Sequence, residues 1–268
     1  MMTLTKTFIH QHKTLFLVAV ITAVFSSCVP QEKMLFLKEA KMQSEVLSEN
    51  YVNDRSVNYK LQPGDNLYIR ALNVLDEKNA SMFNGDNSNR TVTSDAGVYL
   101  QSYNVDENGC IEMPLVGVVE VKNLTVEEAK DKLQTAINQY ISGTTLIVKL
   151  SNFNITLTGE VHKPGMYKVY QSQINIFEAL SMAGNVTTFA KNDEVKIIRQ
   201  TDDGSEIVLV NIGQADILSS PYYYLKPNDI IYVEPLKIKQ WGFSTFPYST
   251  VISIVTLGIT LFTLIKKK

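Results

Sequence analysis

The sequence is poor in the side chains that most often carry chemistry in proteins. It holds two cysteines and three histidines in 268 residues. Only His162 lies outside the first fifteen residues, and a single histidine supplies neither a metal cluster nor a Ser-His-Asp triad. No phosphate-binding loop of the Walker type occurs, and no GxGxxG motif follows a strand. We therefore predict no catalytic residues, no metal site and no cofactor, and we expect a protein that is not an enzyme.

Positive charge is neither in excess nor clustered. The net charge is −2, and no run of arginines or of alternating basic and aromatic residues is present before the terminal lysines. Nucleic acid is a polyanion whose binding needs clustered Lys and Arg. These features exclude nucleic acid as an expected partner.

The N-terminus is typical of a targeting segment. Lys6 and Lys13 precede an apolar run, Leu15 to Phe25, and Ser26-Ser27-Cys28 follows. Small residues directly before a cysteine resemble a bacterial lipoprotein signal, in which Cys28 is lipidated. The alternatives are an ordinary signal peptide or an uncleaved anchor. If Cys28 carries lipid, Cys110 has no partner for a disulfide, and we expect it to be a small buried residue.

One short motif occurs twice. Leu-x-Pro-x-Asp-x-apolar-Tyr-apolar describes both 61–69 and 225–233. Such a motif predicts a turn that begins at proline and whose aspartate accepts hydrogen bonds from nearby backbone N–H groups before a strand starts. We assign a structural role in these turns to the following residues: Pro63, Gly64, Asp65, Pro227 and Asp229.

The motifs lie in two predicted units. In the first, 76–104 is a long polar loop without periodicity, Asn108-Gly109 forms a hairpin turn, and a helix opens at the capping box Thr125/Glu128. That helix should end near Ser142-Gly143, with Ala129, Leu133, Ala136, Ile137 and Tyr140 on its apolar face.

The second unit combines strands with one helix. Strands are expected at 155–159, 166–170, 195–199, 207–211 and 225–233, with a helix over 174–183. The run Tyr222-Tyr223-Tyr224 suits either stacking on sugar rings or ordinary packing at a strand entry.

The last stretch, Tyr248 to Ile265, contains no charge and no proline. Eighteen helical residues span about 27 Å, close to the ~30 Å hydrocarbon core of a bilayer. Its hydroxyl residues recur at spacings of three and four and form one stripe on a helix: Ser249, Ser253, Thr256, Thr260 and Thr263. The stripe suits either a plain anchor whose hydroxyls bond their own helix, or helices packed in a ring.

Several of these segments carry a family resemblance. YKLQPGDNLYIRALN, GCIEMPLVGVVEV and LTVEEAKDKL resemble the polysaccharide export domain of Wza-type outer-membrane export proteins. ITLTGEVHKPGMYKV, INIFEALSMAGN and LKPNDIIYVEP look like a soluble-ligand-binding β-grasp domain. Together the two resemblances cover about two-thirds of the chain, with one β-grasp unit where the family type has more.

The resemblance implies an α+β fold in five segments. These are a lipoprotein signal peptide over 1–27, a linker over 28–50, a polysaccharide export domain over 51–151, a β-grasp domain over 152–236, and a linker with a C-terminal transmembrane helix over 237–268. It also implies a homo-oligomeric ring, often an octamer, with a periplasmic body that is lipid-anchored at the outer membrane. C-terminal helices would form an α-helical barrel, and the substrate would be capsular polysaccharide or exopolysaccharide. The expected inner-membrane partner is a polysaccharide co-polymerase that is often a tyrosine autokinase.

Two rival interpretations remain open from the sequence. The chain could be a monomeric, membrane-anchored adaptor that binds glycan through the β-grasp unit. Alternatively, the C-terminal tail could lie in the inner membrane with its lysines in the cytoplasm.

Overall fold

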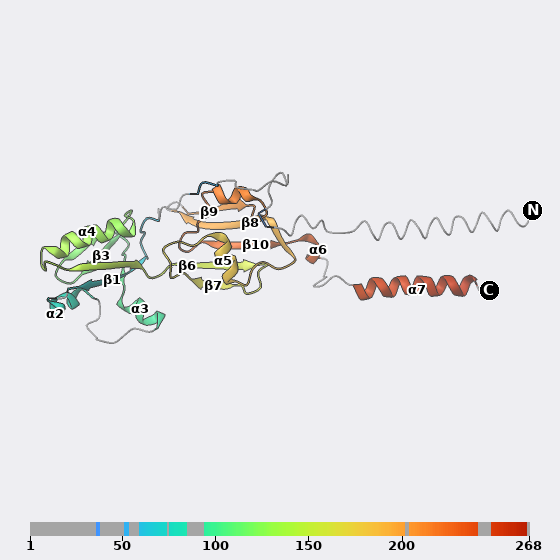
Figure 1. Ribbon diagram of the computed structural model, residues 1–268, viewed down its shortest axis with the longest axis horizontal. Helices are drawn as coiled ribbons and strands as arrows, with labels where there is room; N and C mark the ends of the chain where they lie inside the picture. Colours follow the sequence, from blue (N-terminus) through green and yellow to red (C-terminus); the bar gives the residue numbers. More distant parts are fainter. Residues whose placement is uncertain are drawn as a thin grey trace, which may run out of the picture.

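The computed structural model describes residues 36–37, 51–53, 59–73, 75–84, 94–201, 204–240 and 248–266. Figure 1 shows two mixed α/β units side by side and a helix at the C-terminus. Each unit has its own buried apolar cluster, one built from residues 61–148 and the other from residues 153–233.

The first unit is built on a three-stranded antiparallel sheet. Its order is β2 (Tyr103–Asn104), β1 (Asn66–Leu72) and β5 (Thr145–Leu150). Residues 67, 69 and 71 of β1 are buried, because alternate side chains of a strand point to the same face. A hairpin of β3 (Cys110–Met113) and β4 (Gly117–Glu120) completes the β structure.

Helix α4 (Val126–Asn138) covers the buried face of this unit. The predicted capping box is confirmed, since Thr125 Oγ1 accepts from Glu128 N at 3.2 Å and Glu128 Oε2 accepts from Thr125 N at 2.7 Å. Ala129, Leu133 and Ile137 are buried as expected. The prediction for Tyr140 was wrong: the helix ends at Asn138, and Tyr140 lies beyond it and is exposed.

The second unit contains a five-stranded mixed sheet (Figure 1). Its order is β7 (Gly165–Lys168), β6 (Asn154–Gly159), β10 (Ile230–Pro235), β8 (Ala190–Thr201) and β9 (Gly204–Val210). Strands β6 and β10 are parallel and the other pairs are antiparallel. Helix α5 (Ile176–Met182) contributes Ile176, Ala179 and Leu180 to the core. A 3₁₀ turn, η3 (Ala215–Ser219), buries Ala215 and Ile217 between β9 and β10.

The polar stretch 76–104 is not structureless where it is described, which corrects the prediction of a loop. It forms α2 (Glu77–Ala80), the 3₁₀ turn η2 (Ser81–Phe83) and α3 (Asp95–Gln101). Two N-caps explain these short helices, because Asp76 and Ser94 side chains accept hydrogen bonds from backbone N–H groups three residues later. Phe83 is fully buried and fixes this stretch to the first core.

The turn at Asn108-Gly109 exists, but the prediction of a hairpin across it was wrong. Strand β2, before the turn, pairs with β1, whereas β3, after it, pairs with β4. The carboxylate of Asp106 accepts hydrogen bonds from the backbone N–H groups of Asn108 and Cys110, at 2.9 and 2.8 Å. The Asp106 side chain therefore stabilises this turn, which was expected to be held by pairing of the two flanking strands. Cys110 is half-buried and not in the core, which corrects a second expectation.

The C-terminal segment is helical as predicted. A short helix, α6 (Lys237–Gln240), follows the second unit, and α7 spans Tyr248–Lys266. Among the residues that the structure describes, none of the helices combines the length and the apolar character that crossing a membrane requires. The prediction of a C-terminal transmembrane helix is therefore confirmed for the helix and not for its spanning role.

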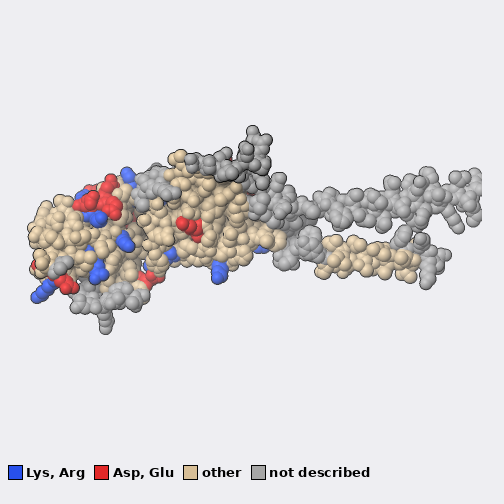
Figure 2. Space-filling model, in the orientation of Figure 1, with Lys and Arg blue, Asp and Glu red and all other residues tan. Residues whose placement is uncertain are grey.

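Side chains of α7 are largely exposed, and no charged residue is visible along it in Figure 2. Charged side chains gather instead over the first unit on the face shown there. The helix thus presents apolar side chains that the described parts of its own chain do not cover.

Candidate binding site at the junction of the two units

The first Pro-x-Asp turn carries a buried aspartate. Pro63 and Gly64 occupy its two central positions, and the backbone N–H of Asp65 closes it by donating to Gln62 O at 3.1 Å. Gly64 has a φ of +90°, a conformation that glycine adopts without strain. Asp65 Oδ2 accepts from Gln62 N at 2.9 Å and from the Tyr59 hydroxyl at 2.8 Å. The side chain therefore satisfies the turn's own backbone and a neighbouring phenol.

Burial raises the pKa of both Asp65 and Tyr59, because it disfavours the charged form of each group. Burial raises the pKa of Asp65, and hydrogen bonds from Gln62 N, the Tyr59 hydroxyl and the Asn152 side chain offset part of that rise. Burial first, and the nearby Asp65 carboxylate second, raise the pKa of Tyr59 well above its usual range. The phenol is therefore a permanent hydrogen-bond donor to Asp65 at neutral pH.

The second Pro-x-Asp turn has the same backbone plan. The N–H of Asp229 donates to Lys226 O at 3.2 Å, and Asp229 Oδ2 accepts from Lys226 N at 2.7 Å. Asn228 takes the place of Gly64 with a φ of +67°. Arg199 completes the turn by donating from Nε to Oδ1 at 2.9 Å and from Nη2 to Oδ2 at 2.7 Å. The fully buried Asp229 carboxylate is thus paired with an almost fully buried guanidinium.

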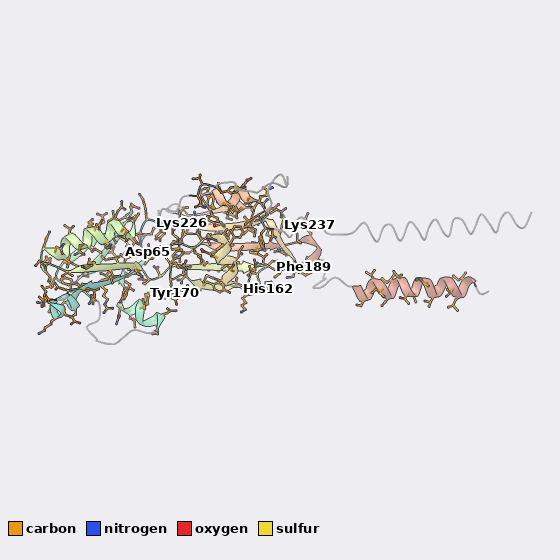
Figure 3. The ribbon with its side chains drawn as sticks, in the orientation of Figure 1. Asp65, His162, Tyr170, Phe189, Lys226 and Lys237 are labelled. Atoms are coloured by element: carbon orange, nitrogen blue, oxygen red, sulfur yellow. The ribbon has the colours of Figure 1, made fainter. Side chains whose placement is uncertain are left out.

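The structure brings the two turns together at the junction of the units. A cavity of about 230 Å³ lies between them, and in Figure 3 the labelled residues Asp65 and Lys226 mark the two sides of this region. The first unit lines the cavity with Tyr59, Gln62, Pro63, Gly64 and Asp65, and the second with Gln200, Thr201 and Asn228. The sequence indicated the turns but not their proximity.

Further contacts cross the junction around the cavity. The Asn152 side chain, between β5 and β6, accepts from Asn66 N at 3.0 Å and donates to Gly64 O at 3.2 Å. On α3, Asp95 Oδ1 accepts from Lys168 Nζ at 2.9 Å and from the Tyr170 hydroxyl at 3.3 Å. The partner groups come from opposite units, so these bonds fix how the walls of the cavity face one another.

The tyrosine run packs against protein groups. Tyr222 lies under the guanidinium of Arg199, with 5.1 Å from Cζ to the ring centroid. Tyr223 packs against Phe177 at 6.4 Å between centroids and against Tyr224 at 4.9 Å. These contacts favour the packing role over sugar stacking, since the ring faces have partners within the chain.

The remaining predicted site residues are Cys28 and the hydroxyl stripe of α7. Cys28 is outside the described residues, so the structure does not test its lipidation. On α7 the hydroxyls of Ser253, Thr256, Thr260 and Thr263 donate to carbonyl oxygens of their own helix at 2.7 to 2.8 Å. No cluster of histidine, cysteine and acidic side chains suited to a metal ion occurs in the described part of the chain.

Several lining residues were not predicted from the sequence. Gln62 and Asn228 belong to the repeated motif, at its variable positions, and the repeat itself was the available signal. Gln200 and Thr201 end β8 before the Asp-Gly turn, and nothing in their local pattern indicated a site. Their role depends on the packing of two units, which one sequence does not reveal.

Comparison with known proteins agrees with this two-unit organisation. The model of the polysaccharide biosynthesis/export protein family matches residues 53–151, and that of the SLBB domain matches residues 154–210. The chain is 30% identical over 145 residues to a protein of Ralstonia solanacearum named EPS I polysaccharide export outer membrane protein EpsA. The match covers 50% of this chain and 36% of the relative.

A protein of the same name from Ralstonia nicotianae is 26% identical over 125 residues, which is 46% of this chain and 30% of the relative. The chain thus spans about a third of the length of these curated relatives. The fold and its junction define a two-unit, mixed α/β protein without catalytic apparatus in the described residues. Residues 53–151 thus match the polysaccharide export family and residues 154–210 the SLBB domain, in agreement with the resemblance to Wza-type export proteins. The prediction that the chain is not an enzyme agrees with the names of these relatives, which refer to export.

Proposed function

We propose that this chain is a subunit of an outer-membrane assembly that exports polysaccharide. The observation that carries this proposal is the order of two matched modules in one chain, an export module over 53–151 and an SLBB module over 154–210. The relatives' names, which refer to polysaccharide export and to the outer membrane, support the same function and location. In this proposal the polysaccharide passes through a conduit formed by the assembled subunits, and the chain catalyses no reaction.

The proposed organisation keeps the segments expected from the sequence, except for the spanning role of the tail. Residues 1–27 are a signal peptide. Cys28, the first residue of the linker over 28–50, carries the lipid. The units over 51–151 and 152–236 form a periplasmic body. An inner-membrane polysaccharide co-polymerase, of the tyrosine autokinase type, supplies the polymer. The lipid attachment rests on the signal that ends in Ser26-Ser27-Cys28, and this partner rests on the family resemblance.

A feature of the second sheet supports assembly into a ring. One cross-strand row runs over its outer face from one edge strand to the other, as the strand registers show: Met166, Thr156, Ile230, Ile198 and Ile207. The two ends of this row, Met166 on β7 and Ile207 on β9, are 72% and 64% exposed. Both are large apolar side chains on edge strands that have no further strand beside them in the described part of the chain.

Two different edges of one sheet suit a head-to-tail contact between copies. In such a heterologous contact, β9 of one copy meets β7 of the next, and repetition closes a ring when the rotation per copy allows it. The row would then continue from copy to copy and remove both apolar ends from water. The same arrangement gathers the α7 helices of neighbouring copies, whose apolar side chains lack partners within the chain.

The experiment measures mass and export for the same variants. Ile207→Asp places a charge at the proposed contact, and Val118→Asp places one on the β3–β4 hairpin, at a site that is also exposed. We expect the full-length wild type and Val118→Asp to be multimers in detergent by light scattering and to restore surface polysaccharide to a deletion strain. Ile207→Asp should dissociate into smaller species and lose export.

A wild-type protein that is monomeric at all concentrations would contradict the ring and favour a monomeric glycan-binding adaptor. Normal surface polysaccharide in the deletion strain would overturn the export function itself.

A further inference from the structure

We infer that the cavity at the junction binds one uncharged sugar unit of the exported polymer. This inference rests on the proposed export function and adds to it a binding site and a ligand class. The site is distinct from the apolar row and from α7, and it is formed by residues of both units.

The size of the cavity suits a single ring. Its volume of about 230 Å³ is below the ~300–1,000 Å³ typical of pockets for drug-sized ligands. At ~30 Å³ for each water in the liquid, it equals roughly seven or eight waters. A monosaccharide unit fits that scale, whereas a lipid chain or a folded peptide segment does not.

The chemistry of the walls selects a neutral, hydroxyl-rich ligand. The Asp229 carboxylate behind the wall is paired with Arg199, and the Asp65 carboxylate in the wall accepts hydrogen bonds from the Tyr59 hydroxyl and Gln62 N. The groups that remain are neutral. In the described part of the chain, the side chains of Gln62, Gln200, Thr201 and Asn228 form no hydrogen bonds with protein groups.

These free groups are of the kind that sugar hydroxyls need. Each carboxamide offers an N–H₂ donor and a carbonyl acceptor, and the threonine hydroxyl is both donor and acceptor. A sugar hydroxyl likewise donates and accepts, so an amide can meet either of its roles. The lining contains no positively charged side chain that could pair with a uronate or a sulfate, so charged sugars would lose hydration without gaining an ion pair.

The position of the cavity explains how binding one unit would suit a transport protein. Gln62 comes from the first unit, and Gln200, Thr201 and Asn228 come from the second. A sugar that forms hydrogen bonds with both walls adds contacts across the junction, and these contacts involve only neutral side chains. Binding through a few neutral hydrogen bonds, each of small net strength, is weak enough to release the polymer again.

Photo-crosslinking in the cells that make the chain tests the site with the native polymer as probe. Full-length protein carries Gln200→p-benzoylphenylalanine or, as a second position in the same wall, Thr201→p-benzoylphenylalanine. The matched control is Gln214→p-benzoylphenylalanine, since Gln214 is an exposed glutamine at the start of η3 whose side chain makes no capping bond. Illumination is followed by purification, sugar detection on the protein band and acid hydrolysis of the adduct.

We expect at least 10-fold more sugar on the protein modified at position 200 or 201 than at position 214, with neutral sugars in the adduct. Equal labelling at all positions, no labelling at 200 and 201, or adducts of acidic sugars alone would overturn the inference. The export function is judged separately by surface polysaccharide in the deletion strain. Export that depends on the chain, together with unlabelled 200 and 201 positions, removes the binding site and leaves the proposed function in place.

Discussion

Arg199 and Asp229 form a two-bond ion pair in the interior of the second unit, with distances of 2.9 Å from Nε to Oδ1 and 2.7 Å from Nη2 to Oδ2. The first unit repeats the same turn around Asp65, but there a tyrosine hydroxyl replaces the guanidinium. The same backbone turn thus carries an aspartate with a cationic partner in one unit and a neutral partner in the other. This difference leads to distinct expectations for the two turns.

Removing the cation from the second turn should be costly. Arg199→Met leaves the Asp229 carboxylate buried without its partner, and the loss of one member of a buried ion pair destabilises proteins by about 3–5 kcal/mol. We expect urea unfolding, followed by circular dichroism, to show a loss of this size for the second unit. Lys196→Met is the matched control, because Lys196 pairs with Glu234 on the partly exposed face of the same strand and should cost less than ~1 kcal/mol. Equal losses for the two variants would contradict the importance of burial.

The first turn should respond to the loss of a hydroxyl. Tyr59→Phe removes the hydrogen bond to Asp65 and leaves a buried acceptor with one partner fewer, at a cost of about 1–3 kcal/mol. The pKa of Asp65 should rise further in this variant, because the tyrosine hydroxyl lowers it in the wild type. Carboxyl chemical shifts as a function of pH report that change. Tyr140→Phe, at a tyrosine that is 54% exposed, should leave both quantities unchanged.

How far the sequence predicts this molecule depends on the range of the interactions involved. The helix at Thr125/Glu128 was predicted because its start depends on side chains three residues apart. The equivalent box at Asn175 and Glu178, with bonds of 2.9 Å in both directions, carried the same local signal and was not used. Pairing of β2 with β1 could not be read from the Asn-Gly turn, because Asp106 closes that turn by itself.

The candidate site shows the same limit more clearly. The sequence identified Asp65 and Asp229 through the repeated motif and assigned them to turns. It did not identify Gln200 or Thr201, because they reach the site only through packing of the second unit against the first. Glutamine and threonine at a strand end have no chemical signature of their own. For a site built from neutral side chains on two units, the sequence therefore predicts the local turns but not how the two units bring them together.

Acid should weaken the attachment of α6 to the second unit. The Glu160 carboxylate accepts from Lys239 Nζ at 2.5 Å and from Thr187 Oγ1 at 2.6 Å. Burial alone would raise the pKa of Glu160, but these two partners outweigh it, and the net pKa lies below the usual 4.5. A carboxyl whose folded-state pKa is lowered contributes stability above its unfolded pKa and loses it as pH falls through the folded value.

We therefore expect the unfolding free energy of the wild type to fall below about pH 4.5 by more than that of Glu160→Gln. The glutamine variant should already be weaker at neutral pH, so the two curves converge in acid. Urea unfolding at a series of pH values measures this, with Glu112→Gln, an exposed acid on β3, as the control that should follow the wild type. Parallel curves for wild type and Glu160→Gln would show that another group causes the acid sensitivity.

The hydroxyl stripe of α7 makes the sharpest test of how the helices are used. In a single copy these hydroxyls are satisfied by their own helix, for example Thr256 Oγ1 to Ile252 O and Thr260 Oγ1 to Thr256 O, both at 2.7 Å. Their small size then matters more than their polarity, since small residues allow two helices to approach closely. Replacing Ser253, Thr256 and Thr260 together by Leu should keep helices of neighbouring copies apart and abolish surface polysaccharide.

The matched control replaces Val251, Ile254 and Ile265 by Leu, which by helical spacing lie on the opposite face of α7. We expect this control to export polysaccharide at the wild-type level, and both triple variants to keep the wild-type helix content by circular dichroism. If the stripe variant also exports normally, α7 serves only as a plain attachment whose hydroxyls bond their own backbone. In that case the contacts between copies must come from the edge strands β7 and β9 alone, and Ile207→Asp would still disrupt them.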